Sequence, residues 1–312
     1  MDKKATRVSV IIPTYKSNGQ VVRTVQEIQE ALDSERIINE ILIVEDCGED
    51  GSWDGVKSLV RRDPRIRGIR LRRNYGQHNA LLCGLRKARY EITLTMDDDG
   101  QHPAGEATKL IREVERGADL VYGTPIDERH STGRNWASVA IKRALDLASE
   151  QKTSEVSAFR ALKTELREVF AAYNDKNVNI DALLNWTTSH TRAIPVEIRT
   201  RAQGQSSYSK RKLIRRTANL IIGFSSLPIK ASGIIGLAVA VFGGLALAFV
   251  IGGWAISGST VPGFVFSTYL ICLFSGTQLI ALGILGEYIA RVHNHTLGRP
   301  AYTIAEEIAK QE

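Results

Sequence analysis

The chain has 312 residues, of which 43% are hydrophobic and 24% charged, and its formal net charge is +7. This length is enough for one catalytic domain and a smaller additional part. The three cysteines, Cys47, Cys83 and Cys272, are odd in number and far apart, which argues against a disulfide framework or a zinc site. No basic stripe is interleaved with aromatic residues, so nucleic-acid binding is not expected.

The first 125 residues alternate between short strands and amphipathic helices. Strands are predicted at residues 7–12, 40–45, 66–71, 91–96 and 118–122, with helices near 20–33, 53–62, 76–88 and 104–116. This alternation predicts a mostly parallel sheet covered by helices on both faces. Such sheets bind ligands beyond the carboxyl ends of their strands. The mixed pattern of residues 155–200 could complete the sheet.

The chain has two clusters of acidic residues. One of them, VEDCGEDGSWD (44–54), begins at the end of a predicted strand. Gly48 and Gly51 suit a turn and a close approach to a ligand. We expect Asp46 to contact the ligand, whereas Asp50 or Ser52 could simply cap the following helix.

Three consecutive carboxylates stand in MDDDGQHP (96–103), directly after another predicted strand. Adjacent carboxylates repel one another, so a cation is expected beside them. If the segment is extended, Asp97 and Asp99 share one face and Asp98 points away. Hard oxygen ligands suit Mg²⁺ or Mn²⁺, which keeps positions open for a diphosphate. An acidic turn or a helix cap is the alternative, but the position after a strand favours the metal.

Residues 125–150 are polar and basic, and they include Arg129 and Arg134. This segment could be a loop that closes over a ligand or an ordinary surface loop.

The C-terminal third contains a block without charge, because residues 231–286 include no Asp, Glu, Lys or Arg. Residues 257–263 divide the block into two segments, each long enough to span a membrane as a helix. A buried helical pair is the alternative. Basic residues flank the block on both sides, which predicts cytoplasmic ends. Residues 210–230 alternate basic and apolar positions and predict an interfacial amphipathic helix.

Homo-oligomerisation through the spans is also expected. The first apolar segment contains several glycines that permit close approach of helices, namely Gly243, Gly244, Gly252 and Gly253.

Several motifs together resemble inverting family-2 glycosyltransferases with the GT-A fold. They are IIPTYKSNGQ (11–20), VEDCGEDGSWD (44–54), RNYGQHNALLCGL (73–85), MDDDGQHP (96–103), VSAFRALKTEL (156–166), RAQGQSSYSKRKL (201–213) and GEYIARVHNHTLGRP (286–300). The set is similar to the polyprenyl-phosphate glycosyltransferase branch, which includes dolichyl-phosphate mannose synthase. The resemblance implies a GT-A domain at 1–209, the interfacial helix at 210–230, two transmembrane helices within 231–286 and a cytoplasmic tail at 287–312.

The resemblance also implies roles for individual residues. The nucleotide pocket would be lined by Pro13, Thr14, Tyr15 and Asp46. Asp97 would lie by the ribose or diphosphate and, with Asp99 and Gln101, serve the metal site. Phosphate groups of donor or acceptor would meet Arg160, Arg201, Ser206 and Tyr208, with Arg129 and Arg134 as further candidates; Asp97, Asp99, Arg160 and Arg201 would carry catalysis.

Three positions depart from the family's pattern. Gly100 stands where Leu is common, Glu45 where Asp is usual, and Ser207 where a Lys usually follows Ser206. The lost Lys removes one cation expected near a phosphate.

The implied reaction moves one sugar, with inversion, from a nucleoside diphosphate sugar, with uridine as the expected base, to polyprenyl phosphate at the cytoplasmic face of the plasma membrane. An ionised phosphate acceptor needs no general base. A hydroxyl acceptor would need one, and Asp181 is the candidate, with helix capping as its other role. A lipid-linked saccharide acceptor and a non-catalytic membrane scaffold are the two alternatives.

Overall fold

A computed structural model describes residues 5–17, 19–126, 156–171, 173–174, 178–199, 227–257 and 263–310. The chain divides into two compact units. The first contains Met1–Asp146, Glu150–Ser207 and Gly298–Glu312, and the second contains Leu147–Ser149 and Tyr208–Leu297. Because the C-terminal residues belong to the first unit, most of the second unit is an insertion within the sequence of the first.

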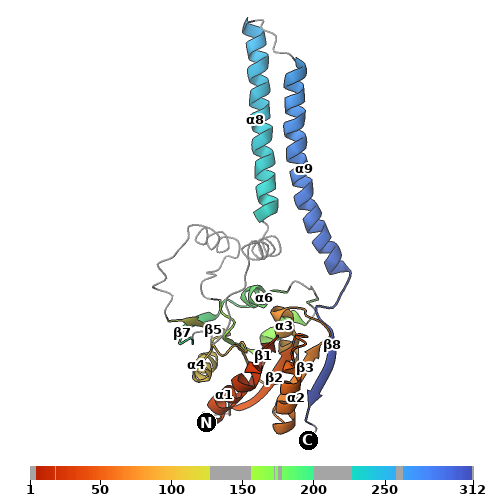
Figure 1. Ribbon diagram of the computed structural model, residues 1–312. Helices are drawn as coiled ribbons and strands as arrows, with labels where there is room; N and C mark the ends of the chain where they lie inside the picture. The colour runs from red at the N-terminus through yellow and green to blue at the C-terminus, as the bar shows by residue number, and fades with distance from the viewer. Residues whose placement is uncertain are drawn as a thin grey trace. The chain divides into compact units, whose positions relative to one another are not determined.

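The described part of the first unit is built on one sheet with the strand order β7-β5-β6-β4-β1-β2-β3-β8 (Figure 1). Its strands are β1 (Arg7–Thr14), β2 (Ile38–Glu45), β3 (Ile66–Leu71), β4 (Ile92–Thr95), β5 (Leu120–Pro125), β6 (Arg160–Lys163), β7 (Thr191–Val196) and β8 (Ile304–Ala309). Strand β1 is parallel to both β2 and β4, and β2 is parallel to β3. The mostly parallel sheet predicted from the first 125 residues is therefore confirmed.

Helices cover both faces of this sheet. The helices are α1 (Gln20–Ser34), α2 (Ser52–Arg62), α3 (Gln77–Lys87), α4 (Ala104–Glu115) and α6 (Ile180–Thr187), with the short 3-10 helix η3 (Thr164–Phe170). One apolar cluster joins one face of the sheet to α1, α2 and α4, and a second joins the other face to α3, η3 and α6. Val10 lies in the first cluster and Ile11 in the second. Both faces of β1 are buried, which explains why its sequence is almost continuously apolar.

Strands β6 and β7 complete the sheet from residues 155–200, as the sequence predicted. Strand β6 runs antiparallel between β4 and β5. This reversal pairs Arg160, the first residue of β6, with Thr95, the last residue of β4. Arg160 therefore lies at the carboxyl end of the parallel strands.

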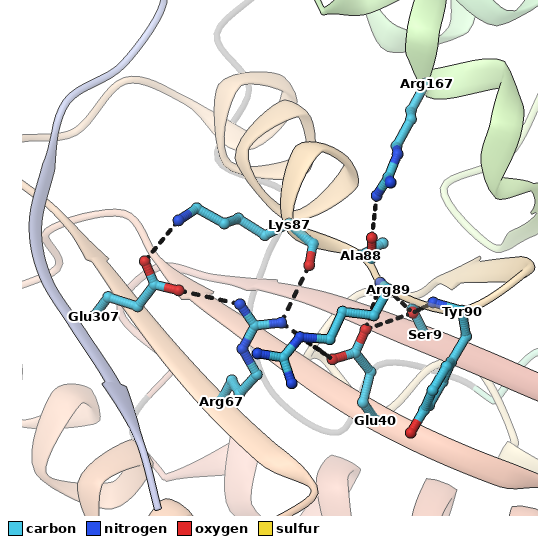
Figure 2. Close-up of polar contacts among 9 residues, drawn as sticks. All are labelled: Ser9, Glu40, Arg67, Lys87, Ala88, Arg89, Tyr90, Arg167 and Glu307. Atoms are coloured by element: carbon cyan, nitrogen blue, oxygen red, sulfur yellow. Dashed lines mark hydrogen bonds and ion pairs between the residues drawn. The ribbon is translucent and has the colours of Figure 1, made fainter. Parts of the chain in front are cut away.

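The C-terminal segment returns to the sheet as the edge strand β8, antiparallel to β3 (Figure 1). The prediction that residues 287–312 form only a tail is wrong for this part. Glu307 accepts hydrogen bonds from Arg67 and Lys87 at 3.1 and 2.8 Å (Figure 2), and Glu306 accepts one from Trp53 Nε1 at 3.0 Å. The pattern IAEEIA is by itself a weak strand signal. The strand is stabilised by these long-range contacts, which no local pattern reveals.

The described part of the second unit contains two long helices, α8 (Leu227–Ser257) and α9 (Gly263–Thr296). Each has a stretch long and apolar enough to cross a membrane, Ser232–Gly253 and Tyr269–Ala290, and at most 6% of either stretch is buried. This exposure contradicts the alternative of a buried helical pair. The helices contact one another at Gly243, where an added Cβ would lie 2.7 Å from the ring of Phe274.

The expected interfacial helix differs at its C-terminal boundary. Residues 227–230 form the first turn of α8 instead of the end of a separate helix, and residues 210–226 lie outside the described part of the chain.

Candidate active site

The carboxyl ends of β1, β2 and β4 lie side by side in the sheet. The register pairs Thr14 with Glu45, the last residues of β1 and β2, and β4 lies on the other side of β1. The Asp46 N–H donates to the Thr14 carbonyl at 2.9 Å, and the Thr14 hydroxyl donates to Asp98 Oδ2 at 2.5 Å. The two acidic clusters of the sequence therefore meet at one end of the sheet, where ligands of such folds bind.

The acidic triplet does not continue the strand before it. Strand β4 ends at Thr95, Asp98 and Asp99 form a turn, and Gly100 has a positive φ of 71°. The argument that placed Asp97 and Asp99 on one face required an extended backbone and is wrong for this segment. Asp98, expected to point away, instead accepts the hydrogen bond from Thr14.

Each carboxylate of the triplet accepts a hydrogen bond from a different donor. Asp97 Oδ1 accepts from Gln77 Nε2 at the start of α3 at 2.6 Å, and Asp99 Oδ1 accepts from the Gln101 N–H at 3.0 Å. Burial raises the pKa of Asp98 to about 6; the Thr14 hydrogen bond opposes this shift and the Asp99 charge adds to it. The three carboxylates thus hold closely spaced negative charge in a half-buried turn.

This donor set fits a divalent cation that is only partly coordinated by protein. Among the described residues, no group of three or more His, Cys, Asp or Glu side chains is arranged to hold a metal. Mg²⁺ commonly takes only one or two carboxylates and obtains its other ligands from water and substrate phosphates. Asp97 and Asp99 supply oxygen donors of this kind, and Gln101 is bound to Asp99 through its backbone.

Asp46 is held by the loop that precedes α3. Its two carboxylate oxygens accept the backbone N–H groups of Tyr75 and Gly76, each at 2.7 Å. Burial raises the pKa of Asp46, the two backbone hydrogen bonds oppose that shift, and the charge of Glu45 adds to it. Gly76 has a φ of 93°, a conformation that favours glycine. Asp46 therefore joins the end of β2 to the start of α3.

Other residues of the acidic cluster at 44–54 have local structural partners. Glu45 pairs with Arg70 Nε at 3.1 Å and also accepts the Gly48 N–H. Asp50 accepts both the N–H of Ser52, the first residue of α2, and its hydroxyl. The N-cap position of α2 is occupied by Gly51 and has no side-chain cap, so the expectation that Asp50 or Ser52 caps this helix is wrong, and Asp50 instead binds Ser52 from one position earlier.

Arg160 is fully buried behind the triplet. Its Nε donates to Thr95 Oγ1 at 3.1 Å, its guanidinium pairs with Asp181, and it lies 6.0 Å from the ring centre of Tyr122. Burial lowers the pKa of Arg160, while electrostatic interactions with Tyr122 and Asp97 oppose the shift. In this arrangement the guanidinium is enclosed by protein instead of facing solvent.

Asp181 does not cap α6, although helix capping was one of the two roles expected for it. Asn179 is the capping residue, and its side chain accepts the N–H groups of Asp181 and Ala182 at 3.0 and 3.2 Å. The Asp181 carboxylate is instead used by Arg160. An Asn directly before the helix is the sequence signal that identifies this cap.

Two further expected site residues lie at or beside the end of β1. Pro13 is the penultimate residue of β1 and Tyr15 follows the strand. The Tyr15 side chain is 46% exposed, with Lys16 Nζ 5.4 Å from its ring centre. An exposed aromatic ring at the carboxyl end of a strand is available to stack on a base.

Both histidines beside the site have contacts that orient their neighbours. His102 stacks on Phe159 with ring centres 4.8 Å apart, and His78 Nδ1 accepts the N–H of Ile180 at the start of α6. Burial lowers the pKa of His102, and the Asp99 charge opposes that shift.

The sequence analysis did not identify Gln77 or Tyr75 as site residues, and only the RNYGQHN motif marked their position. Five expected phosphate-contact residues lie outside the described residues: Arg129, Arg134, Arg201, Ser206 and Tyr208.

A mostly parallel sheet with an acidic turn at the carboxyl ends of its strands is the arrangement expected of a GT-A glycosyltransferase domain. The family model for glycosyl transferase family 2 matches residues 9–173, more than half of the chain. The protein belongs to this family, as its motifs predicted.

Curated relatives extend over almost the entire chain. Undecaprenyl-phosphate 4-deoxy-4-formamido-L-arabinose transferase from Pseudomonas paraeruginosa is 29% identical over 95% of this chain and 89% of its own length. The protein of that name from Shewanella sediminis is 28% identical over 96% of this chain and 92% of its own length. These alignments include the two apolar helices.

Solved structures share the fold of the first unit. Mannosyl-3-phosphoglycerate synthase from Rubrobacter xylanophilus aligns with a TM-score of 0.51 and 16% identity, over 69% of this chain and 72% of its own. Glucosyl-3-phosphoglycerate synthase from Mycobacterium tuberculosis, in complex with Mn²⁺, UDP-glucose and phosphoglyceric acid, aligns with a TM-score of 0.51 and 16% identity, over 70% of this chain and 78% of its own. At this identity the likeness establishes the GT-A fold.

Proposed function

We propose that the protein transfers one sugar, with inversion, from a nucleoside diphosphate sugar to the phosphate of a polyprenyl lipid. The observation that carries this proposal is the alignment with transferases named for undecaprenyl phosphate, which covers 95% of the chain. It includes both the acidic carboxyl end of the sheet and the two helices of membrane-spanning length. The sugar in those relatives' names, 4-deoxy-4-formamido-L-arabinose, is the first donor sugar to test, with uridine as the expected base.

The proposed reaction needs no general base. A phosphate monoester has a second pKa of about 6 and is mostly dianionic at neutral pH. One of its oxygens attacks the anomeric carbon from the face opposite the leaving group, while the bond to the donor diphosphate breaks. Asp181 is therefore not required as a base, which agrees with its ion pair to the buried Arg160.

Residues at the carboxyl end of the sheet would divide the remaining work. Pro13, Thr14, Tyr15 and Asp46 would form the nucleotide pocket. Asp97, Asp99 and Gln101 would hold Mg²⁺ or Mn²⁺, which when bound offsets charge on the diphosphate. Arg160 would keep Asp181 and the end of β4, directly before the triplet, in place. The acceptor phosphate would be met by the basic and hydroxyl residues expected from the sequence: Arg129, Arg134, Arg201, Ser206 and Tyr208.

The membrane helices suit a lipid acceptor. A polyprenyl chain stays in the bilayer and only its phosphate reaches the aqueous phase. The flanking basic residues favour a cytoplasmic catalytic unit and cytoplasmic termini. The proposed domains are therefore the catalytic unit at 1–209, the interfacial segment and spans up to 286, and a C-terminal part at 287–312 that contains β8.

The test uses the full-length protein in nanodiscs that contain undecaprenyl phosphate and Mn²⁺. Each of a panel of nucleotide sugars is added, and the lipid fraction is analysed by mass spectrometry. We expect a lipid heavier by one sugar residue with one donor of the panel, together with release of the nucleoside diphosphate.

Two outcomes would replace this proposal. Product formed only on an added lipid-linked saccharide, and not on undecaprenyl phosphate, would establish the alternative acceptor. Nucleotide binding without diphosphate release from any donor would favour a non-catalytic scaffold.

A further inference from the structure

The segment that follows the second apolar helix is an integral part of the first unit. In residues 301–304, Ala301 is 1% exposed and belongs to the same apolar cluster as Val44 and Leu71. The carbonyl of Thr303 accepts the N–H of Arg72 at 2.9 Å. This segment is therefore fixed to the backbone directly before the loop that holds Asp46.

The side chain of Thr303 reaches the same loop. Its hydroxyl lies 2.5 Å from the hydroxyl of Tyr75, and either group can donate the hydrogen bond. Tyr75 and Gly76 donate the two backbone hydrogen bonds to Asp46. A continuous path of hydrogen bonds and one side chain thus leads from Thr303 to the carboxylate at the end of β2.

Tyr75 connects the two groups, because its hydroxyl contacts Thr303 and its backbone N–H binds Asp46, and further contacts restrain its ring and its carbonyl. The guanidinium of Arg73 lies 4.8 Å from the Tyr75 ring centre, and Asn79 Nδ2 donates to the Tyr75 carbonyl at 2.7 Å. The hydroxyl of Tyr75 is the group that hydrogen-bonds with Thr303 of the C-terminal segment.

We propose that Thr303 is a positioning residue for the donor nucleotide, acting through Tyr75 on the two N–H groups that orient Asp46. The inference rests on the proposed function, in which Asp46 contacts the nucleotide. Thr303 follows the last residue of α9 by only seven positions. The donor pocket and the membrane helix are thereby linked by one short stretch of chain.

A purely structural role of Thr303 would be the docking of β8 on β3. That docking has a separate set of contacts at the amino end of the sheet, where Glu307 is bound by Arg67 and Lys87 (Figure 2). The substitution Glu307→Gln weakens these contacts without touching Tyr75. It therefore separates docking of the strand from positioning of Asp46.

The experiment compares the full-length variants Thr303→Val, Tyr75→Phe, their combination, Thr303→Ser, Glu307→Gln and Thr108→Val in nanodiscs. Thr108 is the matched control, because its hydroxyl donates to the Gly105 carbonyl within α4. The measurements are KM for the donor, kcat, and hydrogen exchange of the peptide that contains the Tyr75 and Gly76 amides.

We expect Thr303→Val and Tyr75→Phe each to raise the donor KM about five-fold with little change in kcat, the size expected from loss of one hydrogen bond. The double variant should be no worse than either single one, because both remove the same contact. Thr303→Ser keeps a hydroxyl and should have the KM of the wild type. Hydrogen exchange of the Tyr75 and Gly76 amides should be faster only in Thr303→Val, Tyr75→Phe and the double variant, which lose the contact. Glu307→Gln and Thr108→Val should leave KM unchanged.

Unchanged KM and unchanged exchange in Thr303→Val would overturn the inference, as would an equal rise of KM in Glu307→Gln. The exchange measurement does not depend on turnover. If exchange responds as expected but the wild-type protein transfers no sugar from any donor, the positioning of Asp46 stands and the proposed function fails.

Discussion

The amino and carboxyl ends of the sheet both contain buried carboxylates, but their partners differ. At the amino end, Glu40 accepts from Arg67 at 3.1 Å, from the hydroxyl of Ser9 at 2.7 Å and from the N–H of Arg89 at 2.7 Å (Figure 2). Arg67 also binds Glu307. Charge at this end is matched by charge within the protein.

At the carboxyl end, Asp97, Asp98 and Asp99 are consecutive and receive hydrogen bonds from an amide, a hydroxyl and a backbone N–H. These three donors are neutral, and two ion pairs also occur at this end of the sheet, Glu45 with Arg70 and Asp181 with Arg160. We propose that the ion pairs of the amino end serve stability and that the triplet at the carboxyl end serves a cationic ligand. The predictions below test this division.

The largest expected effect is at the amino end. Arg67→Met leaves Glu40 buried without its guanidinium, and we expect the free energy of unfolding to fall by about 3–5 kcal/mol. Denaturant unfolding of the purified protein measures this loss. Arg61→Met, at an exposed position of α2, should change it by less than about 0.5 kcal/mol. Equal losses in the two variants would contradict a special role for the buried pair.

The second prediction concerns the carboxyl end. Asp99→Asn removes one oxygen anion of the triplet, and we expect kcat to fall by about 100-fold or more because charge on the leaving diphosphate is less well compensated. Stability should be unchanged or higher, since repulsion from Asp98 is relieved. Asp54→Asn, in the first turn of α2, is the matched control.

A binding measurement sharpens the Asp99 prediction. Mn²⁺ together with UDP should raise the melting temperature of the wild-type protein and of Asp54→Asn, but not that of Asp99→Asn. Equal stabilisation of all three proteins would place the metal elsewhere.

The smallest expected effect is a pH dependence at β8. Burial pushes the pKa of Glu307 upward, but hydrogen bonds from Lys87 and Arg67 outweigh it and hold this pKa below its ordinary value. A lowered pKa in the folded state stabilises the protein above the unfolded pKa of about 4.3, and this contribution is lost as the pH falls through the folded value. We therefore expect the melting-temperature difference between wild type and Glu307→Gln to be present at pH 7 and to shrink below about pH 4. A constant difference would show that the Glu307 charge is not involved.

The sequence predicted the first half of the fold well, because β1 to β5 and α1 to α4 have strong local periodicity. It did not predict β8, whose residues 304–309 have a weak pattern and depend on partners more than 200 positions away, such as Arg67. It also missed the antiparallel insertion of β6, since strand order is not a local property.

For the site, the residue types were predictable and their orientations were not. The acidic triplet was placed correctly at the carboxyl end of the sheet, yet its facing was wrong because β4 ends at Thr95 and a turn follows. Arg160 was expected to face a phosphate, but the structure buries it against Asp181. Whether Arg160 faces a phosphate or is buried depends on the packing of α6, which carries Asp181, and local sequence patterns do not predict that packing.

The return of the chain to the sheet after α9 affects how the catalytic part can be isolated. A fragment that stops before residue 210 would lack Ala301 and β8, leaving β3 as an open edge strand and uncovering the apolar residues behind Tyr75. Open apolar edges promote aggregation. A soluble version of the domain should therefore replace the two helices with a short linker and keep Gly298–Glu312.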